Sequence, residues 1–280
     1  VSDNFITLAK FLLQGVDYFI DAHLQELKNE NPDCIIHDSF CTWGKVAAKI
    51  LKIKAISSIT TLVLRKKYFS LDLLKMFFTG IGDYFRFKKL ARIYDKKYGL
   101  KFNLDNILTN EETLNLVYTS KYFQPDVKKL PDRFKFVGPS IKKRKKGETT
   151  FPFFKLKNKP IIYISLGTIK NKNINFFQKC IQLFKNEKYT IVMSVGSKKN
   201  LKKISPIPDN FIIKCFVPQL EILKKADAFI SHGGMNSVQE ALYFKVPLVL
   251  IPQQPEQKLI SERVEELGAG ICCETKHLKG

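Results

Sequence analysis

Hydrophobic and polar positions follow two kinds of pattern in the first part of the chain, one typical of helices and one typical of strands. Apolar residues at 5–27 recur every three or four positions, which predicts an amphipathic helix. The short apolar run CIIHDSF at 34–40 then predicts a strand, KVAAKILKI at 45–53 a helix, and AISSIT at 55–60 a second strand. This order favours a parallel sheet with crossover connections.

The rest of the first half is less regular. Residues 64–100 are aromatic and basic, and Gly80 and Gly82 interrupt their helical spacing, so two or three short helices are expected. LNLVYTS at 114–120 and FKFVGPS at 134–140 predict two more strands. The charged stretch that follows has no periodicity, as is typical of a linker.

The second half repeats the alternation of strands and helices. Its strand-like runs lie at 161–168, 190–196, 211–216, 226–231, 246–252 and 269–273. Helical spacing is found at 174–184, 237–244 and 256–268. The chain is therefore predicted to be α/β, with domains at 1–140 and 159–280 joined by a linker at 141–158. Such a pair places a ligand cleft between the domains, outside the carboxyl ends of the strands.

Composition supports a compact, globular α/β protein, and the cysteine content indicates the cellular compartment. A content of 45% hydrophobic and 26% charged residues excludes disordered and fibrous classes. The six cysteines form no CxxC pair, which favours a reducing, cytoplasmic setting. No apolar run is long enough to predict a transmembrane helix, and no signal peptide is recognisable. Because the chain starts without methionine inside a predicted helix, we expect a fragment.

The formal net charge of +21 raises the question of an anionic partner. Only six of the 47 basic residues are arginine, the side chain that nucleic-acid recognition favours, and no nucleic-acid-binding motif accompanies them. A lysine-rich, solvated surface is the simplest interpretation, and we expect no nucleic-acid partner. Peripheral contact with an anionic membrane surface is the alternative.

Two turns in the second half have residues suited to a phosphate. SLGT at 165–168 puts a glycine beside the hydroxyl of Thr168 at a strand end, although such turns are ordinary in α/β folds. SHGGMNSVQE at 231–240 follows a strand, and Asn236 or Ser237 is expected to open a helix whose positive end can hold an anion. Alternatively, the glycines form only a loop and Asn236 or Ser237 only a helix cap.

The longer string around this turn is more specific. FVPQLEILKKADAFISHGGMNSVQEALYFKVPLVLIPQQPEQ, at 216–257, closely resembles the donor-binding signature of family 1 glycosyltransferases. FVGPS, IYISLGT, HGGMNS and RVEELGAG occur in family order, and the chain from residue 34 onward is most similar to the bacterial macrolide-glycosyltransferase branch. The resemblance implies the GT-B fold, in which two Rossmann-like domains face each other across a cleft. Residues 1–140 would be a partial acceptor-binding domain and 159–280 a donor-binding domain, both truncated at the chain ends.

The resemblance also implies roles for residues in the donor-binding half. Phe216 would stack on uracil, Val217 would contact the base through its backbone, and Gln219 would seat the nucleoside. The residues expected around the diphosphate are Thr168, His232, Gly234, Asn236 and Ser237.

The resemblance also implies which residues bind the ribose of the donor and which bind its transferred sugar. Glu240, one helical turn after Asn236, would bind the ribose. Glu256 and Gln257 match the pair that holds the donor sugar's hydroxyls, and glutamine favours glucose. Lys245 departs from the family, which usually has glycine there; a left-handed turn at this helix end would cost a lysine more than a glycine.

The implied mechanism is an inverting transfer. A general base takes the proton of the acceptor hydroxyl, while dipolar and cationic groups stabilise the departing UDP without a metal or cofactor. Asp38 matches the aspartate that orients the family's catalytic histidine, and the chain starts after the loop that carries this histidine. His37 is not expected to be the base, because neighbours on a strand point to opposite faces.

The predicted function is UDP-sugar-dependent transfer of a hexose, with glucose favoured, to a hydroxyl of a small hydrophobic acceptor such as a macrolide or flavonoid. The acceptor would lie among the aromatic residues from Tyr68 to Phe87. Two alternatives remain open. One is a membrane-associated transferase with a lipid acceptor, and the other is a fragment that binds UDP-sugar without catalysis.

Overall fold

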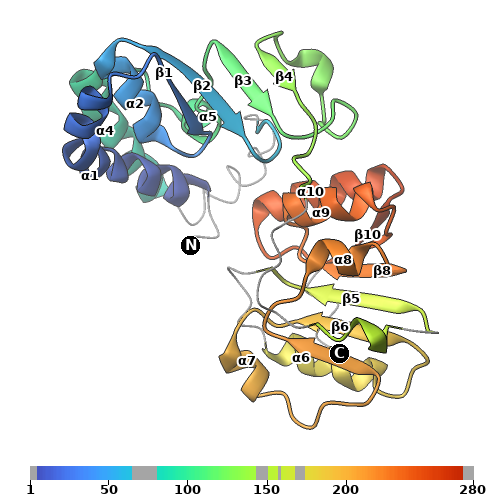
Figure 1. The fold of residues 1–280 in the computed structure, drawn as a ribbon. Helices are drawn as coiled ribbons and strands as arrows, with labels where there is room; N and C mark the ends of the chain where they lie inside the picture. Colours follow the sequence, from blue (N-terminus) through green and yellow to red (C-terminus); the bar gives the residue numbers. More distant parts are fainter. Residues whose placement is uncertain (1–4, 65–80, 143–150, 157–158, 168–173, 274–280) are drawn as a thin grey trace. The chain divides into compact units, whose positions relative to one another are not determined.

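The computed structural model describes residues 5–64, 81–142, 151–156, 159–167 and 174–273. The chain divides into two compact units, Val1–Ser140 and Ile141–Gly280 (Figure 1). Much of the predicted linker, at 143–150 and 157–158, lies outside the described residues. Its described part includes a short 3-10 helix, η3 (Phe153–Lys155), that the sequence pattern did not predict.

Unit 1 contains a four-stranded sheet in the order β1-β2-β3-β4, and every neighbouring pair is parallel. The strands are β1 (Cys34–Asp38), β2 (Lys54–Ile59), β3 (Leu114–Val117) and β4 (Phe134–Phe136). The helices are α1 (Phe5–Glu30), α2 (Thr42–Leu51), α4 (Ile81–Tyr98) and α5 (Leu104–Thr109), with a 3-10 helix η2 (Val127–Lys129). Helix α1 packs against α2, α4 and α5, and the predicted strand–helix–strand order is confirmed.

The prediction of two or three short helices at 64–100 can be compared with the structure only from residue 81 onward. Residues 81–98 form a single 18-residue helix, α4, and Gly82 lies in its first turn instead of breaking it. Gly82 is the second residue of α4, and the conformational freedom of glycine costs a helix most in its interior. The apolar side chains of Phe87, Ala91 and Tyr94 follow a helical spacing and are buried in the core shared with α1. Residues 65–80, which include most of the predicted acceptor segment, lie outside the described residues.

Unit 2 contains a six-stranded parallel sheet in the order β10-β9-β8-β5-β6-β7. The strands are β5 (Ile161–Ser165), β6 (Thr190–Ser194), β7 (Phe211–Lys214), β8 (Ala228–Ser231), β9 (Leu248–Leu250) and β10 (Gly270–Cys272). From β5 the chain builds the sheet outward to β7, then returns to the other side of β5 and builds outward to β10. The direction therefore reverses between β5 and β8, and open α/β sheets bind ligands at such a switch point.

The helices of unit 2 follow the same alternation. They are α6 (Ile174–Phe184), α7 (Lys198–Lys202), α8 (Gln219–Leu223), α9 (Met235–Tyr243) and α10 (Pro255–Glu266). In Figure 1, α9 and α10 lie beside β8 and β10, whereas α6 lies beside β6. All six strands and the three longer helices match the predicted runs, whereas α7 and α8 were not predicted. Five residues are too few to show a helical period.

Lys245 occupies the left-handed backbone region, with φ of 58°. The Lys245 N–H donates to the carbonyl of Leu242, and the Val246 N–H donates to that of Ala241. These two bonds form the motif that ends many helices and normally has glycine at this position. The helix end is thus the left-handed turn considered from the sequence, built with an exposed lysine.

Replacing Lys245 with glycine should stabilise the protein. Left-handed backbone costs an L residue about 1–2 kcal/mol, and the greater freedom of glycine in the unfolded chain offsets part of the gain. We expect a net increase of roughly 0.5–1 kcal/mol in the free energy of unfolding, measured by urea denaturation followed by circular dichroism. Lys203→Gly is a matched control, because Lys203 ends α7 with φ of −89°. If both variants lose stability, the left-handed strain at Lys245 is refuted.

Candidate functional site

The loops that follow β5 and β8 lie against each other at the switch point of unit 2. The two strands are paired in register up to Ser165 and Ser231, so their carboxyl ends are level. A Cβ atom added to Gly167, in the first loop, would lie 2.7 Å from the imidazole of His232, in the second. Thr168 lies outside the described residues.

The imidazole of His232 fits between two glycines. A Cβ atom on Gly234 would approach Nε2 of His232 to 2.5 Å, and one on Gly167 would approach it to 2.7 Å. Real Cβ contacts are not that short, so both positions need glycine to leave room for the ring. Gly167 also has a positive φ of 76°, which favours glycine independently. The glycines seen in the sequence therefore serve the histidine as well as any ligand.

Burial controls the protonation of His232. It lowers the pKa of the imidazole, and a hydrogen bond with the backbone of Ser165 opposes only part of this effect. Within the described part of the chain, the buried Nδ1 atom has no hydrogen-bond partner. His232 is thus a neutral ring at neutral pH, and an anion placed beside it would favour the protonated form.

Helix α9 starts at the same edge of the sheet. Its N-cap is Gly234, and no side chain caps it. The helix therefore begins at Met235, one or two residues before the predicted start at Asn236 or Ser237, and the interpretation of either residue as the cap is wrong. Asn236 is exposed in the first turn. The uncapped amides and the positive end of the helix dipole are suited to binding an anion.

Gln219, the first residue of α8, connects two other predicted site residues. Its Nε2 atom donates to Oε2 of Glu240 at 2.7 Å and to Oγ of Ser237 at 3.3 Å. The hydroxyl of Tyr163 donates to the Oε1 atom of Gln219 at 2.9 Å. Three residues assigned to the nucleotide, from two helices, are thus joined by one amide. Glu240 is 6% exposed, so its carboxylate is fixed largely inside the protein.

Tyr163 was missed by the sequence analysis. It lies in the middle of β5, where alternation indicates only that a side chain is buried. The available signal was its hydroxyl, because a buried tyrosine usually hydrogen-bonds to a partner.

Phe216 and Val217 lie between β7 and α8, and Pro218 separates them from Gln219. The ring of Phe216 is 52% exposed, whereas Val217 is partly buried. A single exposed phenylalanine is common on protein surfaces. This one lies three residues from Gln219, so its ring is available for stacking close to the predicted nucleoside site.

Glu256 and Gln257 lie in the first turn of α10, which packs against the loop after β8. A Cβ atom on Gly233 would lie 2.4 Å from Oγ of Ser261 and 3.1 Å from the backbone oxygen of Gln257. The Oε1 atom of Gln257 accepts a hydrogen bond from the backbone N–H of Gln253 at 2.9 Å. This bond orients the side chain of Gln257. The predicted sugar-binding pair is therefore next to the predicted diphosphate loop.

In unit 1, Asp38 ends β1 with its carboxylate held by nearby groups. One oxygen accepts from the Phe40 amide at 2.8 Å and the other from the Thr60 hydroxyl at 3.4 Å. These two bonds fix the carboxylate at the carboxyl end of β1, beside the end of β2. This is the strand-end position that the sequence comparison assigned to it.

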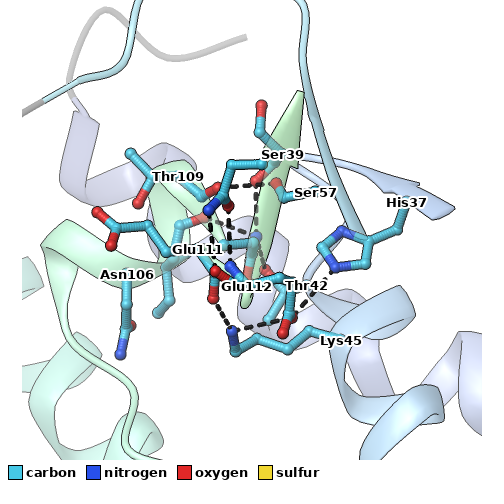
Figure 2. Close-up of polar contacts among 12 residues, drawn as sticks. His37, Ser39, Thr42, Lys45, Ser57, Asn106, Thr109, Glu111 and Glu112 are labelled. Atoms are coloured by element: carbon cyan, nitrogen blue, oxygen red, sulfur yellow. Dashed lines mark hydrogen bonds and ion pairs between the residues drawn. The ribbon is translucent and has the colours of Figure 1, made fainter. Parts of the chain in front are cut away.

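His37 belongs to a separate buried network (Figure 2). It is 4% exposed, its Nδ1 atom lies 3.0 Å from the backbone oxygen of Asp38, and its Nε2 atom lies 3.3 Å from Glu112. Lys45 donates to the same Glu112 oxygen at 3.0 Å. Burial raises the pKa of the Glu112 carboxyl, but His37 and Lys45 outweigh it, so the pKa lies below its usual value. His37 is thus a structural residue that faces away from the Asp38 carboxylate.

Two features are absent from the part of the chain that the structure describes. No cluster of three or more His, Cys, Asp or Glu side chains there could hold a metal ion. None of the helices there has the length and apolar character needed to cross a membrane.

Sequence comparison identifies relatives of both units. The C-terminal domain model of erythromycin biosynthesis protein CIII-like proteins matches residues 186–280. NDP-glycosyltransferase YjiC of Bacillus licheniformis is 38% identical over 90% of this chain and 61% of its own length. The uncharacterized UDP-glucosyltransferase YojK of Bacillus subtilis is 36% identical over 88% of this chain and 62% of its own length. The chain thus spans about three fifths of the length of these relatives.

Solved structures share the fold of the whole chain. The glycotransferase of kitacinnamycin has a TM-score of 0.80 at 22% identity, over 98% of this chain and 71% of its own. The calicheamicin glycosyltransferase CalG4 has a TM-score of 0.76 at 25% identity, over 97% of this chain and 70% of its own. These matches confirm the predicted GT-B fold with its Rossmann-like domains. Along most of its length the chain is thus similar to bacterial glycosyltransferases, in agreement with the resemblance to the macrolide-glycosyltransferase branch of family 1 seen in the sequence.

Proposed function

We propose that this chain carries the donor site of an inverting glycosyltransferase that moves a hexose from UDP to a hydroxyl of a small hydrophobic acceptor. The observation that carries the proposal is the Gln219 amide, which joins Ser237 and Glu240 beside the uncapped start of α9. This assembly lies at the switch point between β5 and β8, where open α/β sheets bind ligands.

Each part of a nucleotide finds a suitable group in this assembly. The first amides of α9 and the ring of His232 would face the diphosphate, because both favour negative charge. The Glu240 carboxylate would accept hydrogen bonds from the ribose hydroxyls, and the exposed ring of Phe216 would stack on the base. The names of the relatives, which refer to UDP-glucose and to nucleoside diphosphates generally, support the choice of donor.

The same groups would stabilise UDP as the leaving group of the reaction. The acceptor oxygen attacks the anomeric carbon of the sugar, the bond to the β-phosphate oxygen breaks, and negative charge develops on UDP. The helix dipole and a protonated His232 would stabilise that charge, so we assign no metal or cofactor to this step. The acceptor proton passes to a base, and Asp38 would orient that base. Gln257, held by Gln253, favours glucose as the transferred sugar.

UDP binding tests the donor site directly. Calorimetry should show that UDP binds the chain and that Phe216→Ala weakens binding roughly 5- to 150-fold, because stacking on a base contributes about 1–3 kcal/mol. Tyr243→Ala is the matched control, since Tyr243 is an exposed aromatic at the opposite end of α9. Absence of UDP binding by the unmodified chain would sink the proposal.

The ionisation of His232 should respond to UDP. Its pKa is lowered in the free protein, so the free energy of unfolding decreases as the pH falls below about 6.5, where only the unfolded chain gains the proton. A bound diphosphate favours the imidazolium and should raise this pKa. NMR titration of the imidazole, assigned with His232→Gln, measures the change. The half-exposed His23 provides an internal control. A His232 titration that saturating UDP leaves unchanged contradicts its placement at the diphosphate.

Turnover separates a transferase from a fragment that only binds UDP-sugar. With UDP-glucose and a phenolic flavonoid, transfer should release UDP and add one hexose to the acceptor, detected by mass spectrometry. UDP binding without any transfer would favour the fragment.

A lipid acceptor at a membrane is the second candidate, favoured by the outer face of α4. Phe85 and Ile93 on this helix are 61% and 52% exposed. The exposed cations around them are Lys88, Lys89, Arg92 and Lys96. An apolar stripe flanked by cations suits the interface of an anionic bilayer, where each cation contributes about 1 kcal/mol.

Vesicle co-sedimentation tests this second candidate. If this face of α4 docks on lipid, changing Lys88, Lys89, Arg92 and Lys96 to glutamine should abolish binding to phosphatidylglycerol vesicles at low salt. Changing the four exposed lysines at α7, which are Lys198, Lys199, Lys202 and Lys203, should reduce binding much less despite the equal loss of charge. Equal effects, or no binding by the unmodified chain, would exclude docking through α4.

A further inference from the structure

Tyr163 lies beneath the donor site, in the core of unit 2. It is 1% exposed, and its ring stacks on Phe229 of the neighbouring strand with centroids 4.5 Å apart. Its hydroxyl donates to the side-chain amide of Gln219 at 2.9 Å. Most of the ring therefore serves packing, whereas the hydroxyl points toward the proposed nucleotide site.

The Glu240 carboxylate selects one of two orientations of the Gln219 amide, and the Tyr163 hydroxyl then holds the amide oxygen in place. In the observed orientation Oε1 accepts from Tyr163, and the two Nε2 hydrogens face Ser237 and Glu240. In the flipped orientation the amide oxygen would face the Glu240 carboxylate, and two acceptors would oppose each other. Glu240 thus determines which way the amide faces, and Tyr163 anchors the amide from the opposite side.

Glu240 depends on that orientation. Its carboxylate is almost fully buried, and a buried charge requires well-placed donors. The Gln219 amide supplies one of them at 2.7 Å and so restricts where the carboxylate oxygens point. The hydrogen bonds therefore run in one direction, from Tyr163 through Gln219 to Glu240.

We propose that Tyr163 is a positioning residue for ribose recognition. By fixing the Gln219 amide, it aims the Glu240 carboxylate at the hydroxyls of the nucleotide's ribose. This inference rests on the proposed function, because it takes Glu240 as the ribose-binding group. It predicts that loss of one buried hydroxyl changes which nucleotides bind, in addition to how stable the protein is.

The test compares UDP with 2′,3′-dideoxyuridine diphosphate, which lacks both hydroxyls that Glu240 would bind. Calorimetry on the full chain gives the ratio of the two dissociation constants. Tyr163→Phe keeps the stacked ring and should weaken UDP binding about three- to tenfold, the range of one hydrogen bond, while binding of the dideoxy analogue stays nearly unchanged. The preference for UDP should fall by the same factor. Tyr243→Phe, an exposed tyrosine on α9, should leave the ratio intact.

A second variant keeps the test decisive if Tyr163→Phe fails to fold. Gln219→Met preserves the length of the side chain and removes the amide, so it should lower the same ratio. If both variants fold, their combination should lower the ratio no further than Gln219→Met alone, because Tyr163 acts only through Gln219.

The possible failures are distinguishable. If the unmodified chain binds neither nucleotide, the proposed function fails. If it binds UDP and the dideoxy analogue equally, Glu240 does not recognise ribose and the inference is overturned while diphosphate binding stands. If it prefers UDP and a folded variant keeps that preference, Tyr163 is only a core residue.

Discussion

The hydrogen bond between Gln219 and Glu240 is the interaction on which the proposed site depends. It joins the start of α8 to the first turns of α9, two helices that follow different strands. The register of β5 and β8 brings Tyr163 under this bond, so the sheet itself determines where the amide can lie. A change in sheet register would move the tyrosine to the other face and remove its contact with Gln219.

Close packing of backbone around His232 imposes a second constraint. Gly167 and Gly234 come from loops 67 positions apart, yet each is restricted by the same imidazole ring. Any larger residue at either position would displace the ring or the loop. Gly234 is also the N-cap of α9, which no side chain caps. One packing requirement therefore shapes both the surroundings of His232 and the uncapped start of the helix.

Much of the fold could be predicted from the sequence, because buried parallel strands are apolar runs and the longer helices are amphipathic. The short helices α7 and α8 could not, since five residues do not complete two turns. The position of α8 matters most, because it places Gln219. Family resemblance indicated Gln219, Ser237 and Glu240, but only the structure shows that one amide joins them. The role of Tyr163 was not predicted, because the apolar pattern of a buried strand does not indicate which group a tyrosine hydroxyl bonds to.

Both units hold polar side chains near strand ends, yet hydrogen bonding distinguishes their roles. In unit 1, His37, Glu112 and Lys45 satisfy one another, so most of their hydrogen-bonding capacity is used inside the protein. In unit 2, α9 begins without a side-chain cap and His232 has a buried nitrogen without a partner in the described structure. Unsatisfied groups cost free energy unless a ligand completes them. At the switch point these groups are suited to the ligand proposed for unit 2, whereas His37, Glu112 and Lys45 bond to one another inside unit 1.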